Sequence, residues 1–133
     1  MNNLQIEIEE AVLIFKENGV LYVNFKPKTS IDLPQAQAVV EKTKLLVQSR
    51  KHCNIVDTKD VIFMTDAARK YFASQRDKNL LGVAIISKSK VQKTLANFYL
   101  QFAKPQVITK LFYTTEEAEK WVTEIFEKEK NKV

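Results

Sequence analysis

Residues 80–86, Leu-Leu-Gly-Val-Ala-Ile-Ile, form a run with no polar side chain in it. A strand that is apolar at every position is covered on both faces, as the central strands of parallel sheets are. Helical periodicity follows over residues 88–103 and ends before Pro105, and a further strand is predicted at residues 107–113. This strand–helix–strand order predicts a parallel sheet with helices packed on it.

The opening residues show the period of strands. Residues 4–8 alternate between apolar and polar side chains, and two more apolar runs cover residues 11–16 and 20–26. Asn18-Gly19 lies between these two runs, and both residue types tolerate a positive φ. The chain is therefore predicted to open with an antiparallel hairpin.

Helical spacing then alternates with short apolar runs. Asp32 is a suitable N-cap and Pro34 suits a first turn, so a helix is predicted from Leu33 to about Ser49. The further predicted elements are a strand at residues 53–58, which residues 61–64 extend or bend away from, a short helix that starts at Thr65-Asp66, and a final helix that starts at the Thr114–Glu117 capping box and reaches Phe126.

The resulting order, ββαβαβαβα, is an α/β fold. It predicts a mixed, mostly parallel sheet with an N-terminal β-hairpin and four helices. With 133 residues, the chain is expected to be one domain spanning residues 1–133. The charged tail from about residue 128 to 133 is expected to fray.

Composition excludes several classes of function. The net charge is +5, but the lysines are interleaved with glutamates, so nucleic-acid binding is not expected. One cysteine, one histidine and two glycines leave no disulfide, no two-histidine metal motif and no phosphate-binding glycine loop, so no metal or cofactor is predicted. With a free cysteine and no signal peptide or membrane-length apolar run, the protein is expected to be cytoplasmic.

Residues 54–68, Asn-Ile-Val-Asp-Thr-Lys-Asp-Val-Ile-Phe-Met-Thr-Asp-Ala-Ala, resemble the strand-to-helix signature of STAS domains, the anti-sigma-factor antagonists and their relatives. Later segments resemble an uncharacterised bacterial group of STAS-like proteins: Ala84–Ser87, Ala96–Tyr99, Lys104-Pro105, Leu111-Phe112 and Glu117–Trp121. The resemblance covers about residues 20–125. It implies a SpoIIAA-like fold and a regulatory module that binds a protein partner.

One departure from that family concerns its phosphate acceptor. In the antagonists, Asp-Ser-Ser-Gly follows the strand, and the second serine receives phosphate from a partner kinase. The matching residues here are Thr65, Asp66, Ala67 and Ala68, so the acceptor position is Ala67, which has no hydroxyl. Thr65 is more simply read as an N-cap, although a phosphate there would lie near Arg69 at a helix N-terminus.

Two candidate sites follow. Asp57, Thr65, Asp66 and Arg69 are predicted at the carboxyl edge of the sheet, as a partner-docking or small polar site. The alternative is that Asp57 bonds to its own loop and Arg69 pairs with a nearby acid. Docking predicts a filled core and an exposed apolar patch beside Thr65.

The second candidate is a site for a small apolar, lipid-like or anionic ligand at Ser87, Asn97 and Lys104. A carrier of such a ligand predicts a cavity of at least a few hundred Å³ lined by Phe98, Phe102 and Trp121. In the alternative, the polar residues lie on helix faces that contact solvent, and the aromatic residues fill the core.

Catalysis is not predicted. His52 and Cys53 are adjacent, so in a strand they point to opposite faces and cannot form a nucleophile–base pair. Cys53 is expected in the core and His52 at a surface strand start. A sheet edge that no other element covers can pair with a second copy of the chain, so a homodimer is also considered.

Overall fold

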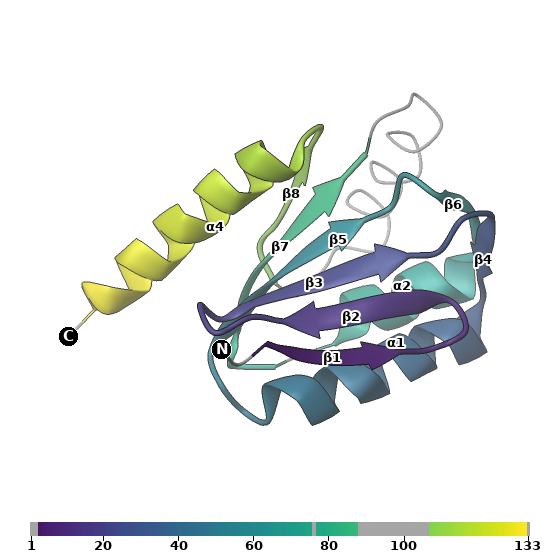
Figure 1. Ribbon diagram of the computed structural model, residues 1–133, viewed down its shortest axis with the longest axis horizontal. Helices are drawn as coiled ribbons and strands as arrows, with labels where there is room; N and C mark the ends of the chain where they lie inside the picture. Colours follow the sequence, from purple (N-terminus) through teal and green to yellow (C-terminus); the bar gives the residue numbers. More distant parts are fainter. Residues whose placement is uncertain (1–2, 76, 88–106, 133) are drawn as a thin grey trace.

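The structure, a computed structural model, describes residues 3–75, 77–87 and 107–132. Within them, six strands form one sheet in the order β1-β2-β3-β5-β7-β8 (Figure 1). Their bounds are β1 Leu4–Glu7, β2 Ala11–Phe15, β3 Val20–Phe25, β5 His52–Asp57, β7 Leu80–Ile86 and β8 Thr109–Phe112.

Strand directions confirm a mixed, mostly parallel sheet. β2 is antiparallel to both β1 and β3, whereas β3, β5, β7 and β8 are mutually parallel. The predicted two-stranded opening is corrected to three strands, because residues 4–7 pair with β2. The helix predicted at residues 88–103 lies outside the described residues.

The turn between β2 and β3 is built as its sequence predicts. Gly19 has a φ of +90°, which glycine adopts without steric cost. The Asn18 Oδ1 accepts a hydrogen bond of 3.1 Å from the Val20 N–H, and Phe15 lies opposite Leu21. The predicted hairpin is confirmed.

A second, two-stranded sheet was not predicted. β4 (Thr29–Ile31) pairs in parallel with β6 (Val61–Met64), and the Thr65 N–H donates to the Ile31 carbonyl at 2.9 Å. Each of these strands leads directly into a helix. Their pairing therefore brings two helix N-termini together.

Three helices lie in the described residues: α1 Leu33–Val47, α2 Asp66–Ser74 and α4 Thr115–Lys130. α1 ends two residues earlier than predicted, because Gln48 and Ser49 have left-handed φ values of 48° and 69°. α4 continues to Lys130, into the charged tail that is expected to fray. None of these three helices is long and apolar enough to cross a membrane.

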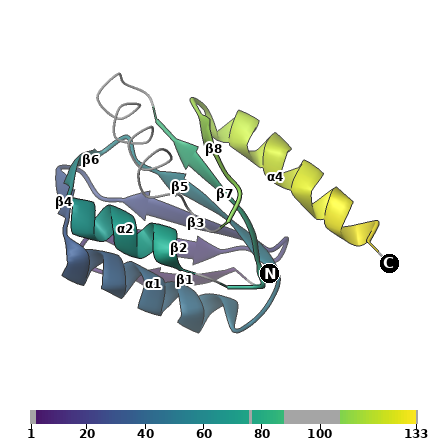
Figure 2. The ribbon, with the colours of Figure 1, turned by 180° about the vertical axis from the view of Figure 1, so that it is seen from behind.

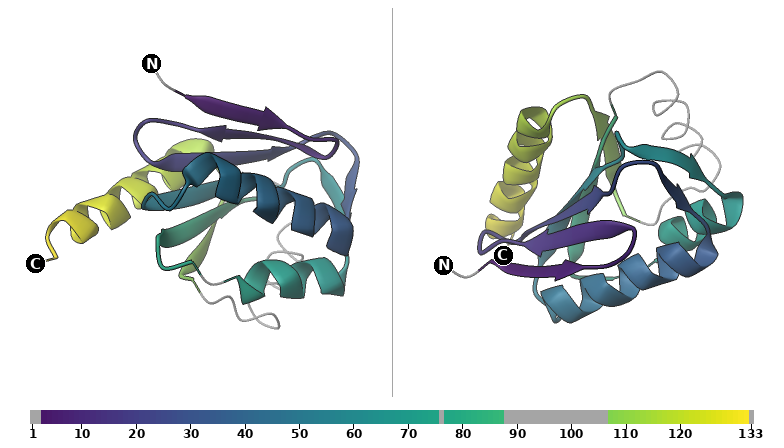
Figure 3. Two further views of the ribbon diagram at one scale, coloured as in Figure 1. Left: turned by 90° about the horizontal axis from the view of Figure 1, so that it is seen from below. Right: turned by 45° about the vertical axis from the view of Figure 1, so that its right-hand side comes forward.

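The helices cover both faces of the sheet. α1 and α2 lie on one face and α4 on the other (Figures 2 and 3). β5 supplies both layers: Cys53 and Ile55 pack toward α4, whereas His52, Asn54 and Val56 face α1 and α2. The α1 and α2 side carries both the junction of these two helices and a cavity beneath them.

Candidate functional site

The first feature is the junction of α1 and α2. The Asp32 Oδ1 accepts a hydrogen bond of 2.8 Å from the Leu33 N–H and caps α1. The Thr65 Oγ1 accepts one of 3.2 Å from the Ala68 N–H and caps α2, as predicted. The same hydroxyl donates to the Asp32 Oδ1 at 2.9 Å, so one carboxylate and one hydroxyl fix both helix starts.

This junction places the Asp32 carboxylate beside the Thr65 hydroxyl, a neighbour that the expectation for a phosphate there did not include. Asp32 is a carboxylate in hydrogen-bond contact with the hydroxyl, and bonds from Leu33 and Thr65 lower its pKa. A phosphate would face this negative charge rather than a free cation. Sequence reasoning placed only Arg69 nearby, because the β4–β6 pairing that brings Asp32 in was not predicted.

Arg69 connects β6 to α2. The side chain is buried, and its guanidinium donates to the Met64 carbonyl at 2.5 Å and to the Asp66 carboxylate. This bears out the alternative in which Arg69 pairs with a nearby acid. Arg69 therefore holds the end of β6 in position, and the exposed group is the carboxylate of Asp66.

Asp57 does not join this group of residues. Its Oδ1 accepts a hydrogen bond of 3.0 Å from the Lys59 N–H, and Lys59 Nζ lies 3.6 Å from Oδ2. These contacts match the alternative in which Asp57 bonds to its own loop. Of the four predicted docking residues, the structure thus brings together Thr65, Asp66 and Arg69, with Asp32 added.

β6 exposes two large apolar side chains. Ile62 is 61% exposed and Phe63 is 54% exposed, immediately before Met64 and Thr65. We call Ile62, Phe63 and Asp66 the β6 surface. Sequence reasoning took Val61–Met64 only as an extension of, or a bend away from, the preceding strand, so it did not predict the exposure of Ile62 and Phe63.

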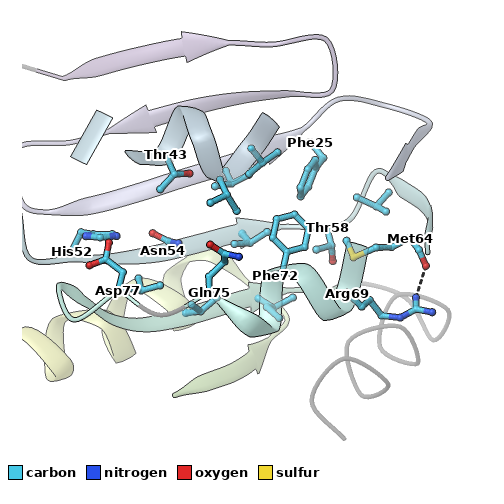
Figure 4. A pocket seen from close by; sticks show the side chains of 18 of the residues that line it. Phe25, Thr43, His52, Asn54, Thr58, Met64, Arg69, Phe72, Gln75 and Asp77 are labelled. Carbon is cyan, nitrogen blue, oxygen red and sulfur yellow. Dashed lines mark hydrogen bonds between the residues drawn. The ribbon is translucent and has the colours of Figure 1, made fainter. Parts of the chain in front are cut away.

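The second feature is a cavity of about 170 Å³ between the sheet and the α1–α2 layer (Figure 4). Its walls are mostly apolar and come from β3, β5, β6, β7, α1 and α2. Figure 4 shows His52, Asn54, Gln75 and Asp77 near one end and Met64 and Arg69 at the other.

This cavity is not lined by Trp121, the one described residue of the three that were predicted to line a carrier's cavity. Trp121 packs on Phe112, with ring centroids 5.5 Å apart, in the α4 layer on the opposite face of the sheet. Residues 97, 98, 102 and 104 of that prediction lie outside the described residues. Ser87 is fully buried, its N–H donates to the Phe112 carbonyl, and its Oγ has no partner among the described residues.

His52 and Cys53 are both buried. Burial raises the pKa of the Cys53 thiol to about 12, so the nucleophilic thiolate is scarce at neutral pH. The predicted surface position of His52 is wrong: it is 1% exposed, its ring meets Phe15 edge-on, and its Nδ1 is 2.8 Å from the Arg50 carbonyl. Because these two residues face opposite layers, they form no catalytic pair.

Metal binding has no support in the described ranges. They contain no group of three histidine, cysteine or acidic side chains that could hold an ion.

The fold places the protein in a class. It is a SpoIIAA-like α/β domain, similar to a crystal structure of an uncharacterised protein of the DUF3478 family from Shewanella loihica PV-4. The TM-score is 0.55 at 10% identity, over 91% of this chain and 92% of that one, so the likeness shows the fold alone.

The chain belongs to the family described as Domain of unknown function (DUF7793), whose model matches residues 14–126. No curated protein matches it. The expected SpoIIAA-like, uncharacterised family is confirmed.

Proposed function

We propose that this protein is a non-enzymatic regulatory module that binds a protein partner through the β6 surface. The observation that carries this proposal is the exposure of Ile62 and Phe63, 61% and 54%, beside the start of α2. Exposed apolar side chains at this place are what docking predicts, whereas the filled core that docking also predicts is not found, because a cavity of about 170 Å³ lies under the α1–α2 layer.

The structure around β6 supports docking because hydrogen bonds anchor the end of this strand. Arg69 is bonded to the Met64 carbonyl at one end of β6, and Thr65 is bonded to Asp32 just beyond it. A pre-positioned surface loses little conformational entropy on binding. The partner that fits it is a protein with an apolar patch and a basic side chain at its rim, opposite the exposed Asp66 carboxylate.

We propose that partner binding does not depend on phosphorylation of a serine at the acceptor position of the antagonist family. Ala67 has no hydroxyl, and the Thr65 hydroxyl is engaged by Asp32 and by the Ala68 N–H. Non-enzymatic action is supported by the high pKa of the Cys53 thiol and by its separation from His52. A free cysteine suits the reducing cytoplasm, which we propose as the compartment.

The alternative, a carrier of a lipid-like ligand, has less support. The described cavity of about 170 Å³ is smaller than the roughly 300–1,000 Å³ of pockets for drug-sized ligands. It also lies across the sheet from Trp121. A lipid chain is therefore not the ligand we propose for it.

Site-specific photo-crosslinking tests the docking proposal. p-Benzoylphenylalanine is incorporated in place of Phe63 and, as the control, in place of Ile108 before β8, which is 63% exposed. We expect a crosslinked protein, in the organism that encodes the chain, only from position 63. Equal crosslinking from both positions, or none from either, would contradict the proposal, and a crosslink between two copies would replace the partner with a homodimer.

A further inference from the structure

The cavity between the sheet and the α1–α2 layer has the dimensions of a small-molecule site. Its volume is about 170 Å³, close to the roughly 150 Å³ of engineered protein cavities that bind benzene. Val56 and Val83 of the sheet and Val40 and Phe72 of the helices are among the residues that line it. All four residues are only partly buried, so the two layers do not pack fully against each other.

At one end of the cavity, a buried hydrogen-bond acceptor has no donor among the described residues. The Asn54 Oδ1 is buried and has no hydrogen-bond partner in the described part of the chain. A buried polar atom left unpaired is costly, and most such atoms in proteins are paired. A bound molecule that donates to this oxygen would remove that cost.

His52, on the same face of β5, adds a second acceptor. Its Nδ1 lies 2.8 Å from the Arg50 carbonyl, and because a carbonyl only accepts, Nδ1 is the donor. The neutral ring, which burial favours by lowering the pKa, then leaves Nε2 as an acceptor. Asp77 lies near this end as well (Figure 4).

Three charged side chains line the wall: Lys44, Arg69 and Asp77. Arg69 lies at the far end, where its guanidinium already bonds to Met64 and Asp66. The end with Asn54, His52 and Asp77 offers acceptors and a carboxylate. A ligand group bound at this end must donate a hydrogen bond, and a deprotonated carboxylate or phosphate has no proton to donate.

We infer that this cavity binds a small, uncharged, mostly apolar molecule of about one ring, which donates one O–H or N–H to Asn54. The apolar walls supply the hydrophobic contact, and the unpaired oxygen orients the ligand. This site is separate from the β6 surface, and the inference does not rest on the proposed docking function.

Phenol and toluene form a matched pair of probes for the unmodified protein. The two have the same ring, but toluene replaces the donor by a methyl group and is the more apolar. Amide shifts in two-dimensional NMR, titrated with each probe, give both affinities. We expect phenol to bind about fivefold more tightly and to shift residues of β5 and α1. Equal or tighter binding of toluene, or no binding of phenol, would overturn the inference.

Three variants locate the site. Asn54→Leu keeps the volume and removes the acceptor, so the preference for phenol over toluene should be lost. Val56→Phe fills the cavity, so both probes should lose binding. Val12→Phe, the same change on a β2 residue that is not part of the cavity wall, should bind both as the unmodified protein does. Phenol binding that survives Val56→Phe would place the ligand elsewhere.

A fourth variant separates this inference from docking. Ile62→Asp alters the β6 surface and should leave phenol binding unchanged. Loss of partner binding with phenol binding retained would show that the two sites act separately. Parallel loss of both, in a protein that is still folded, would contradict the separation.

Discussion

The Thr65 hydroxyl donates a hydrogen bond of 2.9 Å to the Asp32 carboxylate and thereby couples the first turns of α1 and α2. The two residues are 33 positions apart, and the β4–β6 pairing brings them together. Because the hydroxyl also caps α2, its loss removes two bonds at once. The junction therefore stabilises the segment that carries the β6 surface.

Replacing Thr65 by valine should destabilise the fold by about 1–2 kcal/mol, as the loss of an N-cap does. Valine keeps the shape of threonine without its hydroxyl. Thr65→Ser keeps the hydroxyl and should cost much less. Urea denaturation measures both variants, and a Thr65→Val protein as stable as Thr65→Ser would show that the coupling contributes nothing.

Asp32 should make stability depend on acid pH. Bonds from Leu33 and Thr65 hold its pKa below the value of about 3.9 that it has in an unfolded chain. Its contribution is therefore complete above that value and is lost as the pH falls through the folded pKa. Asp32→Asn still caps α1 and should flatten the loss of stability below about pH 4. Urea midpoints that fall equally in both proteins would contradict this assignment.

His52 should act in a different pH window. Burial lowers its pKa, against the opposing effects of the Arg50 carbonyl and the Asp77 carboxylate. The unfolded chain then binds the proton more tightly, so stability is complete above about pH 6.5 and falls as the pH drops toward the folded pKa. His52→Gln should remove this slope between about pH 7 and 5. If the variant shows the same dependence of stability on pH, another titratable group causes that dependence.

Arg69 should matter for stability far more than its exposed neighbour does. Arg69→Met removes the donor to the Met64 carbonyl and should cost about 1–3 kcal/mol. Lys70→Met, on the exposed side of α2, should change stability little. Thermal unfolding of both variants gives the comparison, and similar losses would show that Arg69 does not hold β6 in place.

The arrangement of the main sheet could be predicted from the sequence because its signals are local. Asn18-Gly19 marks the hairpin, and the unbroken apolar run of residues 80–86 marks a strand covered on both faces. The Thr65 and Thr114 caps were predictable for the same reason.

The site could be predicted only in part, because its contacts join distant residues. The β4–β6 pairing leaves no local pattern, so Asp32 was missed as the partner of Thr65. Asn54 and His52 lie on alternate positions of β5, but sequence alone did not show that the layer above them is incompletely filled. The exposure of Ile62 and Phe63 likewise depends on how β6 sits beside the core.

The most direct test of the proposed function is the affinity of the crosslinked partner for two matched variants. Ile62→Asp and Ile108→Asp make the same change at side chains that are 61% and 63% exposed, in β6 and before β8. Isothermal titration with the purified partner should show at least about tenfold weaker binding for Ile62→Asp and unchanged binding for Ile108→Asp. Equal affinities for the two variants would contradict docking through the β6 surface.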